Sequence, residues 1–218
     1  MTQTPLSSPE ILVGDVHLSV YAPAKRLVDI AGACVGLLLT AALFPFIAMM
    51  ILLDSPGPIL YAQERVGLSG RRFRMFKFRS MVTNADAKQH LVANASPDGL
   101  LFKSPTDPRV TRVGRFLRRT SLDELPQFWH VLKGEMSLVG TRPPRPQEVE
   151  RYAPTHWTRL AVKPGITGLW QVSGRSEILD FEQVVALDRR YQAQWSLALD
   201  LRIIWQTVVT IFTGRGAC

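Results

Sequence analysis

Hydrophobic residues are distributed unevenly along the chain, and one long run dominates the pattern. Residues Ile30–Leu53 are 24 consecutive positions without a charge. As a helix rising ~1.5 Å per residue, this run would be about 36 Å long, which exceeds the roughly 30 Å hydrocarbon core of a bilayer. The run begins too late and is too long for a cleaved signal peptide, and it is more apolar than a typical buried helix. We therefore predict a membrane helix.

Pro45 and the basic flanks of the run argue against a simple crossing. Pro45 removes one backbone donor inside the run, so the helix should break or bend there. Basic residues stand on both sides of the run (Lys25 and Arg26 before it; Arg65, Arg71 and Arg72 after it). The positive-inside rule places both flanks in the cytoplasm. We predict a re-entrant helix-break-helix over 25–54, with a spanning helix as the alternative; the carbonyls freed at the break must be satisfied within protein.

Shorter patterns predict the remaining elements. Residues 59–81 read as extended segments joined at Gly67–Gly70, and 109–119 (RVTRVGRFLRR) as a basic amphipathic helix on a membrane surface. In SLDELPQFWHVLKG, Ser121 and Glu124 match a capping box, and Gly134 should end the helix. Further helices are predicted around Gln147–Arg159 and over 181–194.

The C-terminal segment QWSLALDLRIIWQTVVTIF is strongly apolar. We expect a helix lying in the membrane interface with Trp195 and Trp205 at headgroup depth, and a plain core helix is the alternative. The predicted fold is mostly α with short β pieces. It consists of an N-terminal tail (1–24), a re-entrant membrane hairpin (25–54) and a compact domain on the cytoplasmic face (55–218) with interfacial amphipathic helices.

Charge adds a second asymmetry. The formal net charge is +8, and residues 64–119 hold thirteen Lys or Arg against four Asp or Glu. A basic middle indicates an anionic partner such as a phosphorylated ligand, anionic lipid or nucleic acid, although a solvated basic face accounts for the charge equally well. A hydrophobic content of 46% excludes a disordered chain, and two cysteines exclude a disulfide framework. The sequence has no Walker lysine motif and no GxGxxG.

Asp123 and Glu124 are the candidate reactive residues. Adjacent acids at a helix start are often only caps. Here they follow several arginines, and nearby cations favour ionised carboxylates. An ionised Asp can attack phosphorus and form an aspartyl-phosphate, while a neighbouring Glu can act as a base or bind Mg²⁺ together with phosphate oxygens. Candidate phosphate-binding residues are Lys77, Arg79, Arg109, Arg118, Arg142, Arg145 and Arg175.

Four strings in chain order resemble the bacterial sugar transferases, the monotopic polyprenyl-phosphate phosphoglycosyl transferases. They are KRLVDIAGACVGLLLTAALFPFIAMM, KFRSM, TDPRVTRVGRFLRRTSLDELPQFWHVLKGEMSLVGTRP and VKPGITGLWQVSGR. The resemblance runs from about Lys25 to the C-terminus. The chain is similar to the short members of the family, which consist of the catalytic core and serve exopolysaccharide synthesis. It implies transfer of a sugar 1-phosphate from a UDP-sugar to undecaprenyl phosphate, with release of UMP, at the cytoplasmic face of the bacterial inner membrane.

The resemblance also implies residue roles. Asp123 would be the nucleophile, and Glu124 would bind Mg²⁺, together with Asp123, or deprotonate the lipid phosphate. Lys77, Arg118 and Arg142 fall on the family's basic positions; with Arg79 and Arg175 they form the predicted phosphate-binding set. Pro45 falls at the family's membrane break. Glucose or galactose 1-phosphate is the expected cargo, with an N-acetylhexosamine as runner-up, and downstream glycosyltransferases are possible partners.

Some positions depart from the family pattern. Phe44 precedes Pro45 where Ser is common, and His130, Glu135 and Thr141 stand where Asn, Asp and Pro are usual. The dyad is intact, so we do not expect an inactive relative. The alternative function is a non-catalytic membrane-surface protein that binds anionic lipid or a partner through its basic face, with the dyad as a cap. Nucleic-acid binding is a third reading, which the membrane run disfavours.

Overall fold

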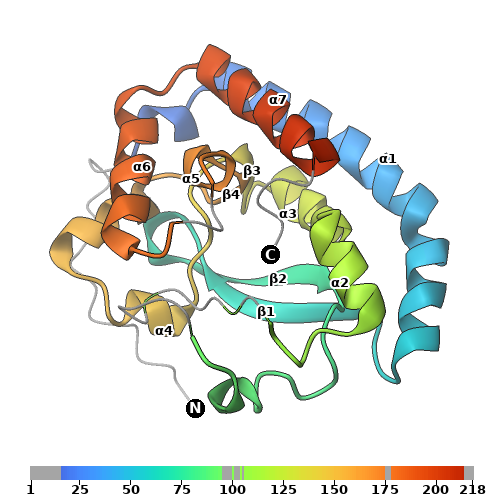
Figure 1. Cartoon of the computed structure of the whole chain (residues 1–218). Coiled ribbons are helices and arrows are strands. Elements are labelled where there is room, and N and C mark those ends of the chain that lie inside the picture. Colours follow the sequence, from blue (N-terminus) through green and yellow to red (C-terminus); the bar gives the residue numbers. More distant parts are fainter. Residues whose placement is uncertain (1–15, 95–99, 101–103, 105, 175–177, 214–218) are drawn as a thin grey trace, which may run out of the picture.

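The computed structural model of the chain describes residues 16–94, 100, 104, 106–174 and 178–213 (Figure 1). The helices are α1 (Pro23–Asp54), α2 (Arg112–Arg119), α3 (Phe128–Lys133), α4 (Pro146–Val149), α5 (Leu169–Val172), α6 (Phe181–Ala193) and α7 (Leu197–Thr213). Short 3-10 helices connect them: η2 (Leu18–Val20), η3 (Leu68–Gly70), η4 (Gln89–Leu91), η5 (Leu122–Gln127) and η6 (Pro154–Ala161). The strands are β1 (Leu60–Val66), β2 (Arg72–Phe78), β3 (Ser137–Val139) and β4 (Gly165–Thr167). The expectation of a mostly helical chain with short strands is confirmed.

Helix α1 is continuous through Pro45, so the predicted interruption of the helix is not found. Figure 1 shows instead that α1 bends in its second half. A proline in a helix interior removes one hydrogen bond and commonly bends the helix, and the hydrogen bonds on either side hold it together. Of the described helices, α1 is the one long and apolar enough to cross a membrane. Whether it enters and leaves on one side remains a prediction.

One face of α1 packs against the rest of the protein. Gly36 lies directly under the Phe128 ring of α3, where an added Cβ would stand 2.3 Å from the ring. Because glycine has no side chain, α3 can approach the α1 backbone closely at this position. The second half of α1 contributes Ile47 and Ile51 to a core cluster with Phe78, Leu117 and Leu125. One face of α1 is therefore packed against the domain, and the domain leaves the other face exposed.

The β1–β2 hairpin lies in the middle of the molecule (Figure 1). The strands are antiparallel, with Leu60 opposite Phe78, Tyr61 opposite Lys77 and Val66 opposite Arg72. The connection passes through Gly70 at φ +79°, a backbone conformation that glycine adopts without strain. The predicted extended segments over 59–81 are confirmed. The second sheet is a short parallel pair, β3 with β4.

A buried polar network ties the start of α1 to the start of α7. Lys25 Nζ lies 2.7 Å from Asp200 Oδ2 and donates to the Val139 carbonyl at 3.2 Å. Tyr191 donates its hydroxyl hydrogen to Asp200 at 2.8 Å. Asp29, one turn after Lys25, accepts from the Ser137 hydroxyl at 2.9 Å. The network sets the position of the long helix relative to the domain.

Several local predictions are wrong, and the reasons are tertiary or involve proline. Ser121 adopts φ +55° and makes no capping hydrogen bond, so there is no capping box, although Gly134 does end α3. The helix predicted around Gln147–Arg159 is split into α4 and η6 because Pro154 lies inside it. Trp195 packs with the α6–α7 core and donates to Asp200, and its depth relative to a membrane stays a prediction.

Two further predictions have mixed outcomes. The helices predicted over 109–119 and 181–194 are found as α2 and α6. The N-terminal tail is docked where it is described: the His17 amide donates to the Ala161 carbonyl at 2.9 Å, and its ring bonds the Gln192 carbonyl at 3.0 Å. Residues 1–15 of the predicted tail lie outside the described residues.

Candidate active site

The Asp123–Glu124 pair lies on η5, in the turn between α2 and α3. Ser121, just before it, takes a left-handed conformation that reverses the chain after α2. η5 packs against strand β2 of the hairpin and against α1, with Leu125 in the core cluster of α1 and Phe78. Asp123 is buried at 7% exposure. The dyad is thus carried on a short turn that a strand and the long helix hold in place.

Lys77 is the basic residue that the structure brings to the dyad. It projects from β2, and its Nζ lies 2.8 Å from Glu124 Oε1. Both side chains keep about a quarter of their surface exposed, at 25% and 24%. An ammonium group beside the partly exposed Glu124 carboxylate is a suitable place for a phosphate, because the cation can turn from the carboxylate to an incoming anion.

Arg118 lies at the end of α2, and its side chain contacts Ser80. Helix α2 begins with Thr111, whose side chain accepts from the Gly114 amide at 2.9 Å. Gly114 rests on the Ser80 backbone, where a Cβ would stand 1.9 Å from the carbonyl oxygen. This close approach lets Arg118 Nε donate to the Ser80 hydroxyl at 3.0 Å. Arg118 is therefore oriented by the end of the β2 segment that also carries Lys77.

Two other candidate arginines have structural partners. The buried Arg79 guanidinium donates to the Pro56 carbonyl at 2.7 Å and the Ser55 carbonyl at 2.6 Å, just past the end of α1. Arg109 forms a two-pronged ion pair with Asp107, with Nη2 2.7 Å and Nε 2.9 Å from its carboxylate oxygens. These contacts give Arg79 and Arg109 roles in holding α1 and a loop.

Arg142 lies in a cluster with Arg65, Arg145 and Glu148. Its Nη1 is 3.2 Å from Glu148 Oε2. Burial raises the pKa of Glu148, but the charges of Arg142 and Arg65 together lower it by more. The pKa therefore falls below its usual value, and the carboxylate is ionised at neutral pH. Arg175, the remaining predicted phosphate-binding residue, lies outside the described residues.

His130 supports the strand that carries Lys77, and the sequence did not predict this contact. It is buried, and its Nε2 accepts from the Phe76 amide at 3.2 Å while Nδ1 lies 2.7 Å from Glu135 Oε2. These contacts assign the hydrogen to Nδ1. His130 thereby pins β2 at the residue before Lys77. The sequence offered only a departure from a family pattern, without indicating the contact.

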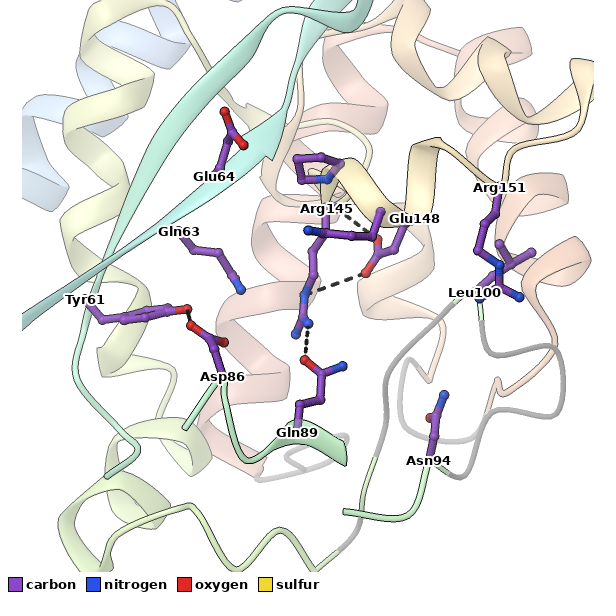
Figure 2. A pocket seen from close by; sticks show the side chains of 12 residues that line it. Tyr61, Gln63, Glu64, Asp86, Gln89, Asn94, Leu100, Arg145, Glu148 and Arg151 are labelled. Carbon is purple, nitrogen blue, oxygen red and sulfur yellow. Dashed lines mark hydrogen bonds and ion pairs between the residues drawn. The ribbon is translucent and has the colours of Figure 1, made fainter. Parts of the chain in front are cut away.

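A cavity between β1 and α4 was also missed. Figure 2 shows it, with the Arg145 side chain reaching from the start of α4 towards Gln89, and the Tyr61 hydroxyl donating to Asp86. Its lining comes from β1, from the segment 86–94 and from α4. Arg145 was a phosphate candidate from composition alone; nothing in the sequence placed it beside the other lining residues.

The acid pair fits one kind of metal site. Among the residues that the structure describes, no three His, Cys, Asp or Glu side chains are grouped as metal ligands. Mg²⁺ is commonly held by one or two carboxylates together with substrate phosphates, so Asp123 and Glu124 fit this mode without a third protein acid.

Comparison with known proteins identifies a family for most of the chain. Residues 20–214 match the bacterial sugar transferase family. The galactosyl transferase CpsE of Streptococcus agalactiae is 50% identical over 195 residues, which cover 89% of this chain and 43% of that protein. The undecaprenyl-phosphate galactose phosphotransferase of Salmonella typhimurium is 42% identical over 199 residues, covering 88% and 41%.

A shorter relative matches over most of its length. The exopolysaccharide production protein ExoY of Rhizobium meliloti is 39% identical over 199 residues, which cover 89% of this chain and 88% of that protein. The chain spans about two fifths of the length of CpsE and of the Salmonella protein.

Proposed function

The chain belongs to the bacterial sugar transferase family, and we propose that it transfers a sugar 1-phosphate from a UDP-sugar to undecaprenyl phosphate, releasing UMP. Its homologues include proteins named undecaprenyl-phosphate sugar phosphotransferases. The observation that carries the proposal is the intact Asp123–Glu124 pair, held on η5 against Lys77 of β2. The product would be the first lipid-linked sugar of an exopolysaccharide or related glycan.

The first half-reaction uses the Asp123 carboxylate as nucleophile. One carboxylate oxygen forms a bond to the phosphorus that bears the sugar, and the bond from that phosphorus to the bridging oxygen breaks. UMP leaves with the bonding electron pair, and the phosphosugar stays on Asp123 as an acyl phosphate. In this proposal Lys77 and Arg118 balance the charge of the phosphate oxygens, the kind of preorganised electrostatic support that lowers such barriers; the Lys77–Glu124 contact supports the role of Lys77.

The second half-reaction returns the enzyme to its starting state. A phosphate oxygen of undecaprenyl phosphate attacks the phosphorus of the intermediate, and the bond to Asp123 breaks, restoring the carboxylate. Glu124 accepts a proton from the lipid phosphate when that group arrives protonated. Because donor and acceptor use Asp123 in turn, the kinetics should be ping-pong.

Mg²⁺ is the proposed cofactor, held by Asp123 and Glu124 together with the substrate phosphates. Bound there, it would neutralise the charge of the diphosphate and of its leaving group.

The proposed location is the cytoplasmic face of the inner membrane, with α1 as the anchor. The face of α1 that the domain leaves uncovered carries large apolar side chains, among them Leu38 at 72% and Leu53 at 81% exposure. A patch of this kind on a soluble surface would be costly in water, and a bilayer would cover it. Trp205 of α7 is 68% exposed and supports a second contact in the interface.

The test is UMP release by the purified chain in nanodiscs, with undecaprenyl phosphate, Mg²⁺ and a panel of UDP-glucose, UDP-galactose and UDP-N-acetylhexosamines. We expect release with one donor, glucose or galactose first. Exchange of labelled UMP into the UDP-sugar should occur without the lipid acceptor, because the first half-reaction is reversible and independent of it.

The matched variant is Asp123→Asn, which preserves shape and removes the nucleophile. It should lower turnover by more than about 10³-fold with an unchanged fold. Unchanged turnover in this variant would eliminate Asp123 as nucleophile. A folded protein that releases no UMP with any donor would instead favour a membrane-surface binding protein whose acid pair serves as a cap.

A further inference from the structure

The cavity between β1 and α4 is large enough for a substrate fragment. Its volume is about 600 Å³, within the roughly 300–1,000 Å³ of ordinary ligand sites. Tyr61 and Gln63 line it from β1, Asp86 and Gln89 from the segment before α2, and Arg145 from the start of α4 (Figure 2). The lining is polar, with an aromatic ring, amides, three carboxylates (Glu64, Asp86 and Glu148) and two guanidinium groups (Arg145 and Arg151), which suits a polar organic molecule.

The cavity adjoins the dyad through the hairpin. Tyr61, on its wall, stands directly opposite Lys77 in the antiparallel register. Side chains of opposed residues leave the same face of a sheet with Cβ atoms roughly 5 Å apart. Lys77 Nζ in turn lies 2.8 Å from Glu124 Oε1. The cavity wall is therefore paired with the part of β2 that carries Lys77, and one substrate can extend from the cavity towards the dyad.

Three arginines surround Glu148, which lines the cavity; Arg145 lines it as well, while Arg65 and Arg142 lie behind the lining. Arg142 and Arg145 approach Glu148 at 3.2 and 3.9 Å, and the buried Arg65 donates to the Pro143 carbonyl at 3.0 Å beside them. Burial, followed by the charge of Arg142, lowers the pKa of Arg65 to about 9. The Nε atoms of Arg65 and Arg145 are buried without a hydrogen-bond partner. Three guanidinium groups around the Glu148 carboxylate favour one further anion.

The other acids of the lining are already matched or exposed. Glu64 pairs with Arg72 at 3.5 Å, and Asp86 accepts from the Tyr61 hydroxyl at the solvent-exposed rim. Burial and the Asp86 contact raise the pKa of Tyr61 to about 12, so its hydroxyl remains a neutral donor. An exposed carboxylate such as that of Asp86 is the group that accepts hydrogen bonds from ribose hydroxyls in nucleotide sites.

The charge decides which half of the donor the cavity suits. In a UDP-sugar, the phosphorus that reacts separates the sugar on one side from a second phosphate and its nucleoside on the other. A sugar in the cavity would place an uncharged hexose beside the arginines that surround Glu148. A nucleoside there would place its own phosphate between the arginines and Lys77, where the charge is complementary.

We propose that this cavity holds the nucleoside monophosphate half of the donor, with Arg145 on its phosphate and Asp86 on its ribose. The assignment rests on the proposed function, because it takes the donor to be a nucleotide diphosphate sugar. It makes the cavity the leaving-group site, which UMP must vacate before the cycle restarts.

The experiment compares the affinities of UMP and of glucose 1-phosphate by titration calorimetry on the full chain in detergent with Mg²⁺. The variants are Arg145→Met and Asp86→Asn, with Arg190→Met on the exposed face of α6 as the matched control. We expect Arg145→Met to weaken UMP binding about 10- to 100-fold through loss of charge-assisted hydrogen bonds. Asp86→Asn should weaken it roughly 3- to 10-fold, and neither variant should change the affinity for glucose 1-phosphate.

Two results would overturn the assignment. One is UMP affinity within about 2-fold of wild type both in Asp86→Asn and in a folded Arg145→Met, which is a negligible change in binding free energy. The other is the reversed pattern, in which glucose 1-phosphate binding falls and UMP binding does not. Asp86 is exposed, so Asp86→Asn decides the matter alone if Arg145→Met fails to fold.

Turnover separates this inference from the proposed function. A wild-type chain that binds UMP through Arg145 and Asp86 but releases none from any UDP-sugar would refute the transferase function and leave the nucleotide site. A chain that releases UMP while both variants bind it normally would keep the function and refute the site.

Discussion

Replacing Lys25 by methionine should loosen the attachment of α1 to the domain. Lys25 and Asp200 form an ion pair of 2.7 Å, and their side chains are only 7% and 2% exposed. Removing one partner of a buried pair costs about 3–5 kcal/mol, because the remaining charge is left without compensation. Asp200 would keep hydrogen bonds from Tyr191 at 2.8 Å and Trp195 at 3.2 Å, so we expect the lower end, about 3 kcal/mol.

Thermal unfolding followed by far-UV circular dichroism in detergent measures this loss. For a chain of this length, 1 kcal/mol corresponds to about 2–4 °C, so Lys25→Met should lower Tm by about 6–12 °C. The matched control is Lys88→Met, the same change at an exposed position, which should move Tm by less than about 2 °C.

A double variant tests the physical reason. Lys25→Met combined with Asp200→Asn removes the isolated buried charge, so it should be more stable than the sum of the two single losses predicts, by roughly 1–3 kcal/mol. If Lys25→Met unfolds within about 2 °C of wild type, or if the two losses simply add, the Lys25–Asp200 contact does not stabilise the protein as argued.

Three further predictions follow from the same contacts. Lys77→Met should lower the rate of UMP release at least about 10-fold, and it should cost little stability because the Lys77–Glu124 pair is partly exposed. Lys133→Met, which breaks a similar 2.7 Å pair with Glu135, is the control. Equal rates for wild type and Lys77→Met would contradict a role of Lys77 in binding the substrate phosphate. Gly36→Ala should lower the free energy of unfolding by about 1–3 kcal/mol in denaturant titrations, although alanine favours helices, because its Cβ meets the Phe128 ring; a more stable variant would contradict this packing. The folded state lowers the pKa of Glu148, so the ionised carboxylate stabilises the protein above its unfolded pKa, near 4.3, and this contribution is lost as the pH falls through the lower folded pKa. The difference in unfolding free energy between wild type and Glu148→Gln, measured in urea titrations, should therefore shrink below about pH 4. A difference that widens in acid would contradict a lowered pKa for Glu148.

Features that depend on a few neighbouring residues were predictable from the sequence. The apolar run from Ile30 to Leu53 lies within one helix, the extended segments around Gly67–Gly70 form a hairpin, and Gly134 ends α3 in a left-handed conformation. Each follows from a local property, such as hydrophobicity over the length of an element or the backbone freedom of glycine. The family resemblance rested on contiguous strings, and residues 20–214 match that family.

Predictions failed where a distant contact decides the local structure. Ser121 and Glu124 have the spacing of a capping box, but η5 packs against β2, and Glu124 pairs with Lys77, which is 47 residues away. Arginines could not be sorted by charge alone, since Arg79 binds the end of α1 while Arg142 joins Glu148. Their roles depend on which backbone or carboxylate lies beside them.

The sequence by itself thus determined a membrane-length apolar helix, an acid pair with basic residues around it and membership of a family. Only the tertiary structure decided that Lys77 faces Glu124, that Lys25 and Asp200 join α1 to α7, and that Arg145 and Asp86 line one cavity. The physical reason is range. Hydrophobic patterning and backbone preferences act between near neighbours, whereas a binding site consists of side chains that chain folding brings together from distant segments.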